Sequence, residues 1–130
     1  MIGLDGQTTT ALVAVGQPVL APILCRGLID TGTDITSVAS KVLRRLGLNT
    51  PTVQATTQTV RGSAPVDLFE VSVNVLDLGN PSRPKFVLPT LRIMELPTPL
   101  SNLDVLIGLD MLLRARLLLD GPGRIFTLDF

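Results

Sequence analysis

The stretch Leu28-Ile29-Asp30-Thr31-Gly32-Thr33-Asp34-Ile35-Thr36 decides the fold that we expect for this chain. Two apolar residues run directly into Asp30, so a strand delivers a carboxylate to a turn. Gly32 allows another backbone or a ligand to come close, and the Thr31 hydroxyl can hydrogen-bond within the turn. An Asp-Thr-Gly sequence can equally be an ordinary turn that ends a strand. Other features of the sequence must therefore separate a catalytic carboxylate from a structural one.

The composition limits the chemistry that the protein can perform. A length of 130 residues fits one domain, residues 1–130, with its own hydrophobic core. Histidine is absent and Cys25 is the single cysteine, which argues against a zinc site, against histidine-dependent catalysis and against an intrachain disulfide. Catalysis would have to use carboxylates, hydroxyls, Lys, Arg or backbone groups, and we expect no metal and no cofactor.

Charge and hydropathy indicate which partners to expect. Eleven basic and eleven acidic residues balance to a net charge of zero without a basic stripe, so we expect no nucleic-acid partner. The longest uncharged run, Gly6 to Cys25, is interrupted by Gly16-Gln17-Pro18 and by Pro22, which makes it a poor membrane span. No signal peptide is evident, so we expect a cytoplasmic protein with no membrane partner.

Strand signals dominate the chain, which is rich in Val, Leu, Ile and Thr. The clearest strand covers residues 66–76, where Phe69, Val71, Val73 and Val75 alternate with polar residues. We expect residues 1–7 to form either a loose arm or an edge strand and residues 77–84 to form a loop. The other segments expected to be extended are residues 8–15, 19–25, 52–60, 86–91, 105–107, 117–119 and 125–128, the last two joined by a turn at 120–123.

One clear helix is expected shortly after the Asp-Thr-Gly turn. Ser37 or Ser40 would cap its N-terminus, and Gly47 would follow its last turn. A second, shorter helix would begin at Gly108. The first helix would cover the sheet with one apolar face, formed by Val42, Leu43 and Leu46.

The segment Val105-Leu106-Ile107-Gly108-Leu109-Asp110 is a second signal, much later in the chain. In this order the two motifs resemble those of the retropepsins, the retroviral-type aspartic proteases. In that family a hydrophobic-hydrophobic-Asp-Thr/Ser-Gly turn carries the catalytic Asp, and a later hydrophobic-hydrophobic-Gly segment packs behind it. By this resemblance, which spans most of residues 19–130, Gly108 would permit close packing behind the turn. Asp110 would be structural, as a helix cap or an ion-pair partner.

The resemblance implies an all-β fold: a closed retropepsin-like acid-protease barrel with one or two short helices and a flap hairpin. Gln54 to Val73 could supply the flap. The C-terminal Phe126-Thr127-Leu128-Asp129-Phe130 looks like the interface strand of the viral enzymes. The helix after the active-site turn and the C-terminal hairpin are more similar to cellular and bacterial retropepsin-like domains than to the compact viral enzymes.

In function, the resemblance implies an aspartic endopeptidase that hydrolyses a peptide or protein substrate. This chemistry needs two carboxylates that share one proton, and the chain contains a single Asp-Thr-Gly. A homodimer with one site on its two-fold axis would supply the second Asp30.

The resemblance also implies a role for each matching residue. Asp30 would be the catalytic carboxylate, and Thr31 and Gly32 would support the pair of carboxylates. Asp34 would either contact the substrate backbone or form an ion pair at the interface. The flap tip would be formed by Arg61, Gly62 and Ser63, with Gly62 as its only glycine where viral flaps carry several.

Two other interpretations remain open at this stage. The chain could be a catalytically silent retropepsin-like module that serves dimerisation or peptide binding, although such a module has no need for clustered carboxylates. It could also be a small β-barrel unrelated to proteases, in which case both motifs would be accidental.

Overall fold

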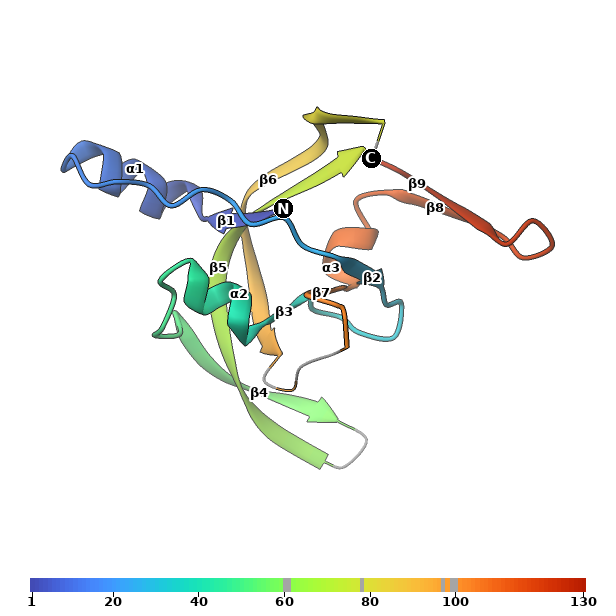
Figure 1. Ribbon diagram of the computed structural model, residues 1–130. Helices are drawn as coiled ribbons and strands as arrows, with labels where there is room; N and C mark the ends of the chain where they lie inside the picture. The colour runs from blue at the N-terminus through green and yellow to red at the C-terminus, as the bar shows by residue number, and fades with distance from the viewer. Residues whose placement is uncertain (60–61, 78, 97, 99–100) are drawn as a thin grey trace.

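The structure, a computed structural model, describes residues 1–59, 62–77, 79–96, 98 and 101–130. The described chain is mostly β-structure, as the sequence predicts, and is built around one main sheet (Figure 1). In chain order the elements are β1 (Ile2–Leu4), α1 (Gly6–Ala14), β2 (Gly27–Ile29), β3 (Ser37–Ala39), α2 (Ser40–Arg45), β4 (Val53–Thr59), β5 (Gly62–Asp77), β6 (Asn80–Leu96), β7 (Val105–Ile107), α3 (Leu109–Leu112), β8 (Arg116–Asp120) and β9 (Ile125–Asp129).

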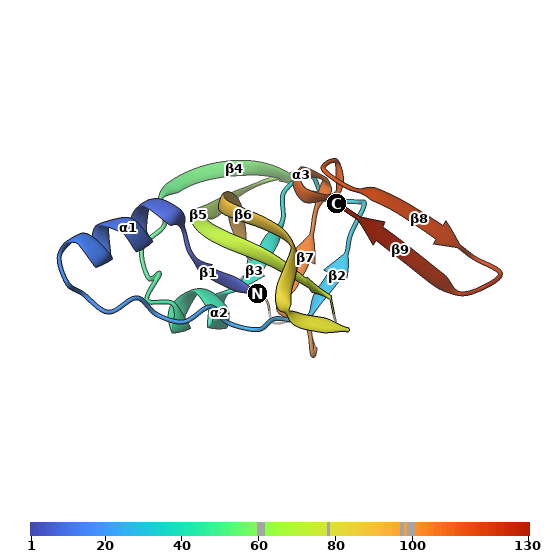
Figure 2. The same ribbon diagram turned by 90° about the horizontal axis from the view of Figure 1, so that it is seen from above.

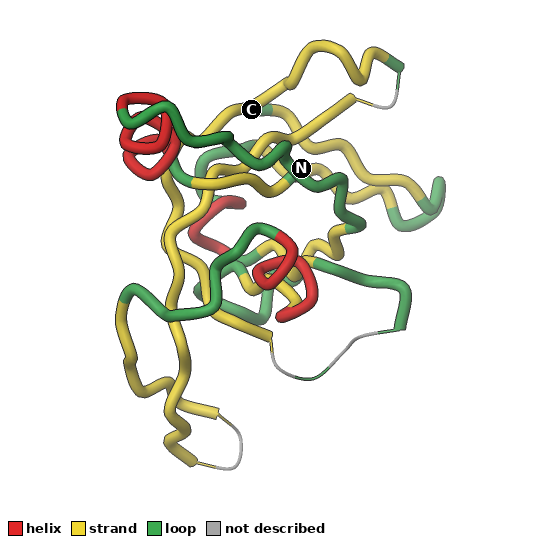
Figure 3. The backbone as a smooth tube through the Cα atoms, turned by 60° about the vertical axis from the view of Figure 1, so that its left-hand side comes forward, coloured by secondary structure: helices red, strands yellow, loops and turns green. Residues whose placement is uncertain are grey.

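The long antiparallel pair β5–β6 forms the spine of the main sheet. β1 and β4 both pair with β5, whereas β3, β7 and β2 follow on the other side of β6. The strand order is β1-β5-β6-β3-β7-β2, with β4 as a further partner of β5. The β4–β5 hairpin reaches past the helices at one end of the molecule, and the β5–β6 hairpin reaches the opposite end (Figure 3).

This sheet is open, so the expectation of a closed barrel is wrong. β1 ends the strand order on one side and β2 ends it on the other. In the described part of the chain, an isolated bridge between Ile2 and Ile23 is what joins β1 to the segment before β2. We predicted a strand over residues 19–25, but Pro22 lacks the amide hydrogen that a continuous ladder needs. Pairing between β1 and the segment before β2 is therefore limited to Ile2 and Ile23.

Helix α1 replaces the strand that the sequence predicted over residues 8–15. Asp5 caps the helix, because its carboxylate accepts hydrogen bonds from the backbone N–H groups of Gln7 and Thr8 at 2.9 and 3.0 Å. A side-chain cap of this kind satisfies amide groups that no helical carbonyl can reach. Residues 1–7 resolve into an edge strand, β1, followed by this cap.

Strand β6 is much longer than the predicted strand over residues 86–91, because the predicted loop over residues 77–84 is largely part of a hairpin. Prolines in this region favoured a loop in the sequence. Their positions coincide with irregularities of the β5–β6 ladder: the register shifts where Pro84 faces Leu76, and again between Val71 and Val73. β-Bulges tolerate proline because part of the ladder is already interrupted there.

Helix α2 confirms the helix predicted after the Asp-Thr-Gly turn. Gly47 follows it with a φ of 74°, a left-handed conformation that favours glycine. The predicted serine cap is wrong, because the N-cap position belongs to Ala39 and has no side-chain hydrogen bond. Ser37 lies in β3, and the Ser40 hydroxyl donates instead to the carbonyl of Leu96 at 3.2 Å.

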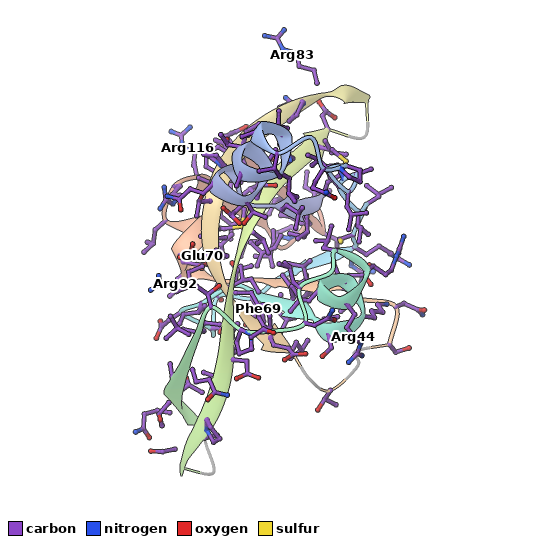
Figure 4. The ribbon with its side chains drawn as sticks, turned by 90° about the vertical axis from the view of Figure 1, so that its left-hand side faces the viewer. Arg44, Phe69, Glu70, Arg83, Arg92 and Arg116 are labelled. Carbon is purple, nitrogen blue, oxygen red and sulfur yellow. The ribbon has the colours of Figure 1, made fainter. Side chains whose placement is uncertain are left out.

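The two faces of β5 differ, as the alternating sequence predicts. Phe69, Val71 and Val73 are buried in the core. On the other face Glu70 and Arg92, which are paired in register, form an ion pair at 2.9 Å (Figure 4). The core extends from β5 and β6 to β1, β3, β7 and the helices α2 and α3, and includes Ile2, Val38, Val42, Leu43, Leu46, Ile93, Val105 and Met111.

Strands β8 and β9 form a separate two-stranded sheet. The predicted turn at 120–123 joins them, and their register pairs Leu117 with Leu128 and Leu119 with Phe126. The hairpin projects away from the rest of the molecule in both Figure 1 and Figure 2. Across the described residues, no helix is both long and apolar enough to cross a membrane.

Asp104 connects the elements that surround the start of β7. Its carboxylate accepts a hydrogen bond from the Arg26 backbone N–H at 2.9 Å and pairs with the Lys41 ammonium at 2.6 Å. Its carbonyl accepts from the N–H of Ala39 at 2.8 Å. The Lys41 ammonium first, and then the Arg26 N–H, lower the pKa of Asp104 below its usual value of 3.8. The ionised carboxylate therefore stabilises the folded state.

We predict that Asp104→Asn lowers stability at neutral pH but makes it less sensitive to acid. A depressed folded-state pKa contributes stability above the unfolded pKa, and this contribution is lost as the pH falls through the folded-state pKa. Asparagine can still accept the Arg26 hydrogen bond and loses only the charge. Urea-unfolding midpoints at pH 7, 5, 4 and 3 should therefore converge for the two proteins in acid. A difference between the two midpoints that stays constant from pH 7 to pH 3 would contradict a stabilising role of the Asp104 charge.

Candidate active site

The Asp-Thr-Gly turn begins where β2 ends beside β7. The two strands are parallel, with Leu28 paired to Leu106 and Ile29 to Ile107. The N–H of Asp30 extends this ladder by donating to the Ile107 carbonyl at 3.0 Å. Because strands fix their backbone through such bonds, the position of Asp30 is set by β7.

The Asp30 carboxylate is oriented from within its own turn. Its Oδ1 accepts a hydrogen bond from the Gly32 N–H at 2.9 Å. A Cβ atom at position 32 would lie 3.2 Å from the same oxygen, which is a tight contact. The carboxylate is half-buried, and Thr31 and Gly32 are exposed beside it. The structure therefore presents one oriented carboxylate at the surface of the molecule.

The chain passes from β2 to β3 around the end of β7. β7 lies between the two strands, parallel to β2 and antiparallel to β3, so the turn over residues 30–36 crosses the carboxyl end of β7. The turn is fixed to the chain after β7 by two backbone bonds, from the Leu109 N–H to the Thr33 carbonyl and from the Asp110 N–H to the Asp34 carbonyl, at 2.9 and 3.1 Å.

Gly108 makes this crossing possible, as the sequence predicts. A Cβ atom built on Gly108 would lie 2.8 Å from the backbone carbon of Ile35, 2.9 Å from the backbone nitrogen of Thr36 and 3.0 Å from the Thr33 oxygen. Real Cβ atoms essentially never approach a backbone this closely. The turn and the start of α3 can therefore touch only if this residue has no side chain.

Thr36 is the residue that joins the turn to α3 most directly. Its side chain is completely buried, and its hydroxyl donates to Asp110 Oδ1 at 2.6 Å and accepts from the Gly108 N–H at 3.0 Å. Its own N–H donates to Asp110 Oδ2 at 3.0 Å. The sequence did not indicate this role, because the partners of Thr36 lie 72 and 74 residues away in the chain.

Asp110 is structural, as predicted, but its partners are hydrogen-bond donors. Its carboxylate accepts from Thr36 through both oxygens and from the Met111 N–H at 2.8 Å. It lies in the first turn of α3, where a negative charge is favoured. Asp34 is exposed, so its two predicted roles stay predictions.

The predicted flap corresponds to the β4–β5 hairpin. β4 pairs with β5 from Val53↔Leu68 to Thr59↔Gly62. Gly62 has a φ of 112°, and the Ser63 hydroxyl accepts a hydrogen bond from Gln58 Nε2 at 2.9 Å. Arg61 lies outside the described residues. The hairpin is confirmed, and its function as a flap stays a prediction.

One pocket among the described residues does not contain the predicted site. It lies where β4 and β5 meet the end of β6, and the predicted catalytic residues Asp30, Thr31 and Gly32 are absent from its lining. Its lining is formed by Gln54, Pro65, Val66, Asp67 and Glu95. Within the described residues, no group of three or more His, Cys, Asp or Glu side chains is arranged to hold a metal ion.

Comparisons of the chain with protein-family models, with curated proteins and with solved structures give no match. The geometry of the turn and the residues that hold it are therefore the observations from which a function can be proposed.

We predict that Gly108→Ala destabilises the protein by about 1–3 kcal/mol, because backbone atoms of the turn must move to admit the new methyl group. Gly6→Ala is the matched control: its Cβ would meet Pro89 at 3.6 Å, an ordinary contact, and alanine suits the first residue of α1. Thermal or urea unfolding measures both. Equal stability of the two variants would contradict the close approach.

We also predict that Thr36→Val costs about 1–3 kcal/mol, although the two side chains have nearly the same shape. Valine leaves the Gly108 N–H without the acceptor that the hydroxyl provides, and a buried donor without a partner is costly. Thr127→Val, an exposed change in β9, should be nearly neutral. Urea unfolding of both variants gives the comparison, and a neutral Thr36→Val would show that the hydroxyl does not hold the turn.

Proposed function

We propose that the protein is an aspartic endopeptidase of the retropepsin type, active as a homodimer. The observation that carries the proposal is the Asp30 carboxylate, which its own turn orients through the Gly32 N–H at 2.9 Å. The approach of Gly108 behind the turn and the buried Thr36–Asp110 hydrogen bonds support the same conclusion. A turn that merely ends a strand has no need of this second layer of support.

The proposed reaction uses the Asp30 carboxylates of two subunits. Two carboxylates a few ångströms apart share one proton, because like charges at that distance resist double ionisation. The ionised carboxylate removes a proton from a water molecule, and the resulting nucleophile attacks the carbonyl carbon of the peptide bond. The protonated carboxyl donates a hydrogen bond to the oxyanion that forms. Collapse of the tetrahedral intermediate transfers a proton to the leaving amine.

The second acid of the pair comes from another subunit in this proposal. Asp110 is the carboxylate that lies directly behind the turn, and its two oxygens are occupied by hydrogen bonds from Thr36 and Met111. Asp110 therefore holds the turn in place, and its oxygens are not free to exchange a proton with a substrate or a water molecule. A copy of Asp30 related by a two-fold axis would meet the first one in an equivalent environment.

The proposed substrate is an extended peptide segment with mainly apolar side chains. In the described part of the chain β4 pairs with β5 alone, so its outer edge can hydrogen-bond to another extended backbone. Near the Asp-Thr-Gly turn, Leu28 and Ile35 expose apolar surface. These groups favour apolar residues next to the bond that is cleaved.

We predict that Asp30→Asn folds and dimerises like the wild type but loses peptidase activity by about 10²- to 10⁴-fold, because asparagine cannot accept or release the shared proton. Asp77→Asn is the control: this carboxylate lies near the β5–β6 turn, its side chain is 41% exposed, and as an amide it can keep its Gly79 hydrogen bond. A peptide-library cleavage assay, with sedimentation of each variant, measures both properties. Full activity of Asp30→Asn would refute the proposal. A wild type that dimerises and binds peptide without cleaving it would identify a silent module.

The pH dependence of activity gives a separate prediction. Peptidase activity should be bell-shaped with pH, because one member of the carboxylate pair must be ionised and the other protonated. Initial rates from acid to alkaline pH on one peptide substrate test this. A rate that stays constant over the whole range would be incompatible with a pair that shares one proton.

A further inference from the structure

The β8–β9 hairpin has one entirely apolar face. Side chains of directly paired residues lie on the same side of an antiparallel ladder, and successive residues alternate. The register therefore separates the hairpin into two faces. The apolar face consists of Leu117, Leu119, Phe126 and Leu128, and the mixed face consists of Arg116, Leu118, Asp120, Ile125, Thr127 and Asp129.

Only half of the apolar face is covered by its own subunit. Leu117 and Leu128 are half-buried near the start of the hairpin, where Phe130 stacks on Phe86 of β6 with ring centroids 4.3 Å apart. Farther out, Leu119 and Phe126 are 70% and 59% exposed. A two-stranded hairpin is marginally stable by itself, and adjacent exposed apolar residues mark an interaction surface. The outer half of this face is therefore expected to meet another molecule.

The sequence of β8 is complementary to itself when two copies run antiparallel. With Leu118 opposite its own copy, Arg116 faces Asp120 of the partner subunit at both ends of the strand. Cross-strand pairs of opposite charge stabilise a sheet, and in the described residues β8 has one edge without a paired strand. Arg116 is exposed at the outer edge of the molecule (Figure 4). Strand β8 thus carries the charges that this pairing needs.

Strand β9 lacks this property. Its own antiparallel pairing, centred on Thr127, would set Ile125 against the partner's Asp129. The outer edge of β1, the edge strand at the N-terminus, is already in use: the Ile2 N–H donates to the Ile23 carbonyl at 2.9 Å, and the Ile23 N–H donates to the Ile2 carbonyl at 2.7 Å. The charge pattern therefore selects β8 as the strand that meets a second copy.

We propose that two copies of the chain join through β8 to form a four-stranded antiparallel sheet in the order β9-β8-β8-β9. The two-fold axis passes beside Leu118, and each Arg116 pairs with the partner's Asp120. The symmetry places the exposed Leu119 next to the partner's Leu117, so the outer half of each apolar face lies over the body of the other subunit. The inference rests on the proposed function only in taking this dimer as the one that joins the two Asp30 residues.

Cysteine cross-linking tests which strand lies at the axis. In a Cys25→Ala background, Leu118→Cys should form a covalent dimer under mild oxidation, because directly opposite residues have Cβ atoms about 4.5–5.5 Å apart, close to the reach of a disulfide. Thr127→Cys is the control, since three strand spacings of about 4.8 Å would separate the two cysteines in the proposed sheet. Cross-linking of Thr127→Cys but not of Leu118→Cys would overturn the proposal.

Charge substitutions test the same interface in solution. Leu118→Asp sets two like charges opposite each other and should raise the dimer dissociation constant at least about tenfold, whereas Thr127→Asp should leave it unchanged. Sedimentation in an Asp30→Asn background measures this without catalysis. A wild type that is active while Leu118→Asp remains fully dimeric would overturn this inference and leave the proposed function intact. If Leu118→Asp dissociates the dimer but the wild type cleaves no peptide, this inference stands and the proposed function is overturned.

Discussion

The contact between two backbones at Gly108 is the constraint on which the site depends. The turn after β2 must cross the end of β7, and the residue that follows β7 has to fit beneath it. The backbone atoms of Ile35 and Thr36 occupy the space where a Cβ atom would lie. A glycine removes this clash, and the buried bonds between Thr36 and Asp110 then hold the two segments together. This packing holds the turn in which the Gly32 N–H orients the Asp30 carboxylate.

The parts of the fold that the sequence predicts are those with strong local signals. The alternation of Phe69, Val71 and Val73 shows which face of β5 is buried, and the predicted turn at 120–123 joins β8 to β9. The two motifs around Asp30 and Gly108 locate the turn and the short helix behind it. In each case the prediction depended on residues close together in the sequence or on a glycine at a position of close packing.

Among the parts that the sequence did not predict, one depends on a local cap and the others depend on contacts between distant residues. The run of Thr, Ala and Val after Asp5 is compatible with a strand, and the cap at Asp5 turns it into α1. The prolines of β6 suggest a loop until β5 supplies a ladder in which they coincide with bulges. Thr36 gave no spacing or composition signal of its own, because its partners, Gly108 and Asp110, are distant in the sequence.

The Asp30 carboxylate and the half-covered hairpin are linked through α3 by hydrogen bonds. The three residues between α3 and β8 each donate a backbone hydrogen bond back to α3, and Arg114 Nε donates to the Asp110 carbonyl at 3.1 Å. Asp110 in turn holds Thr36 and the turn that carries Asp30. The start of β8 is therefore fixed relative to Asp30 through a continuous chain of hydrogen bonds. In the proposed dimer, the two-fold axis that pairs the charges and apolar face of β8 also fixes where the second Asp30 lies, so a single symmetry operation has to meet both requirements.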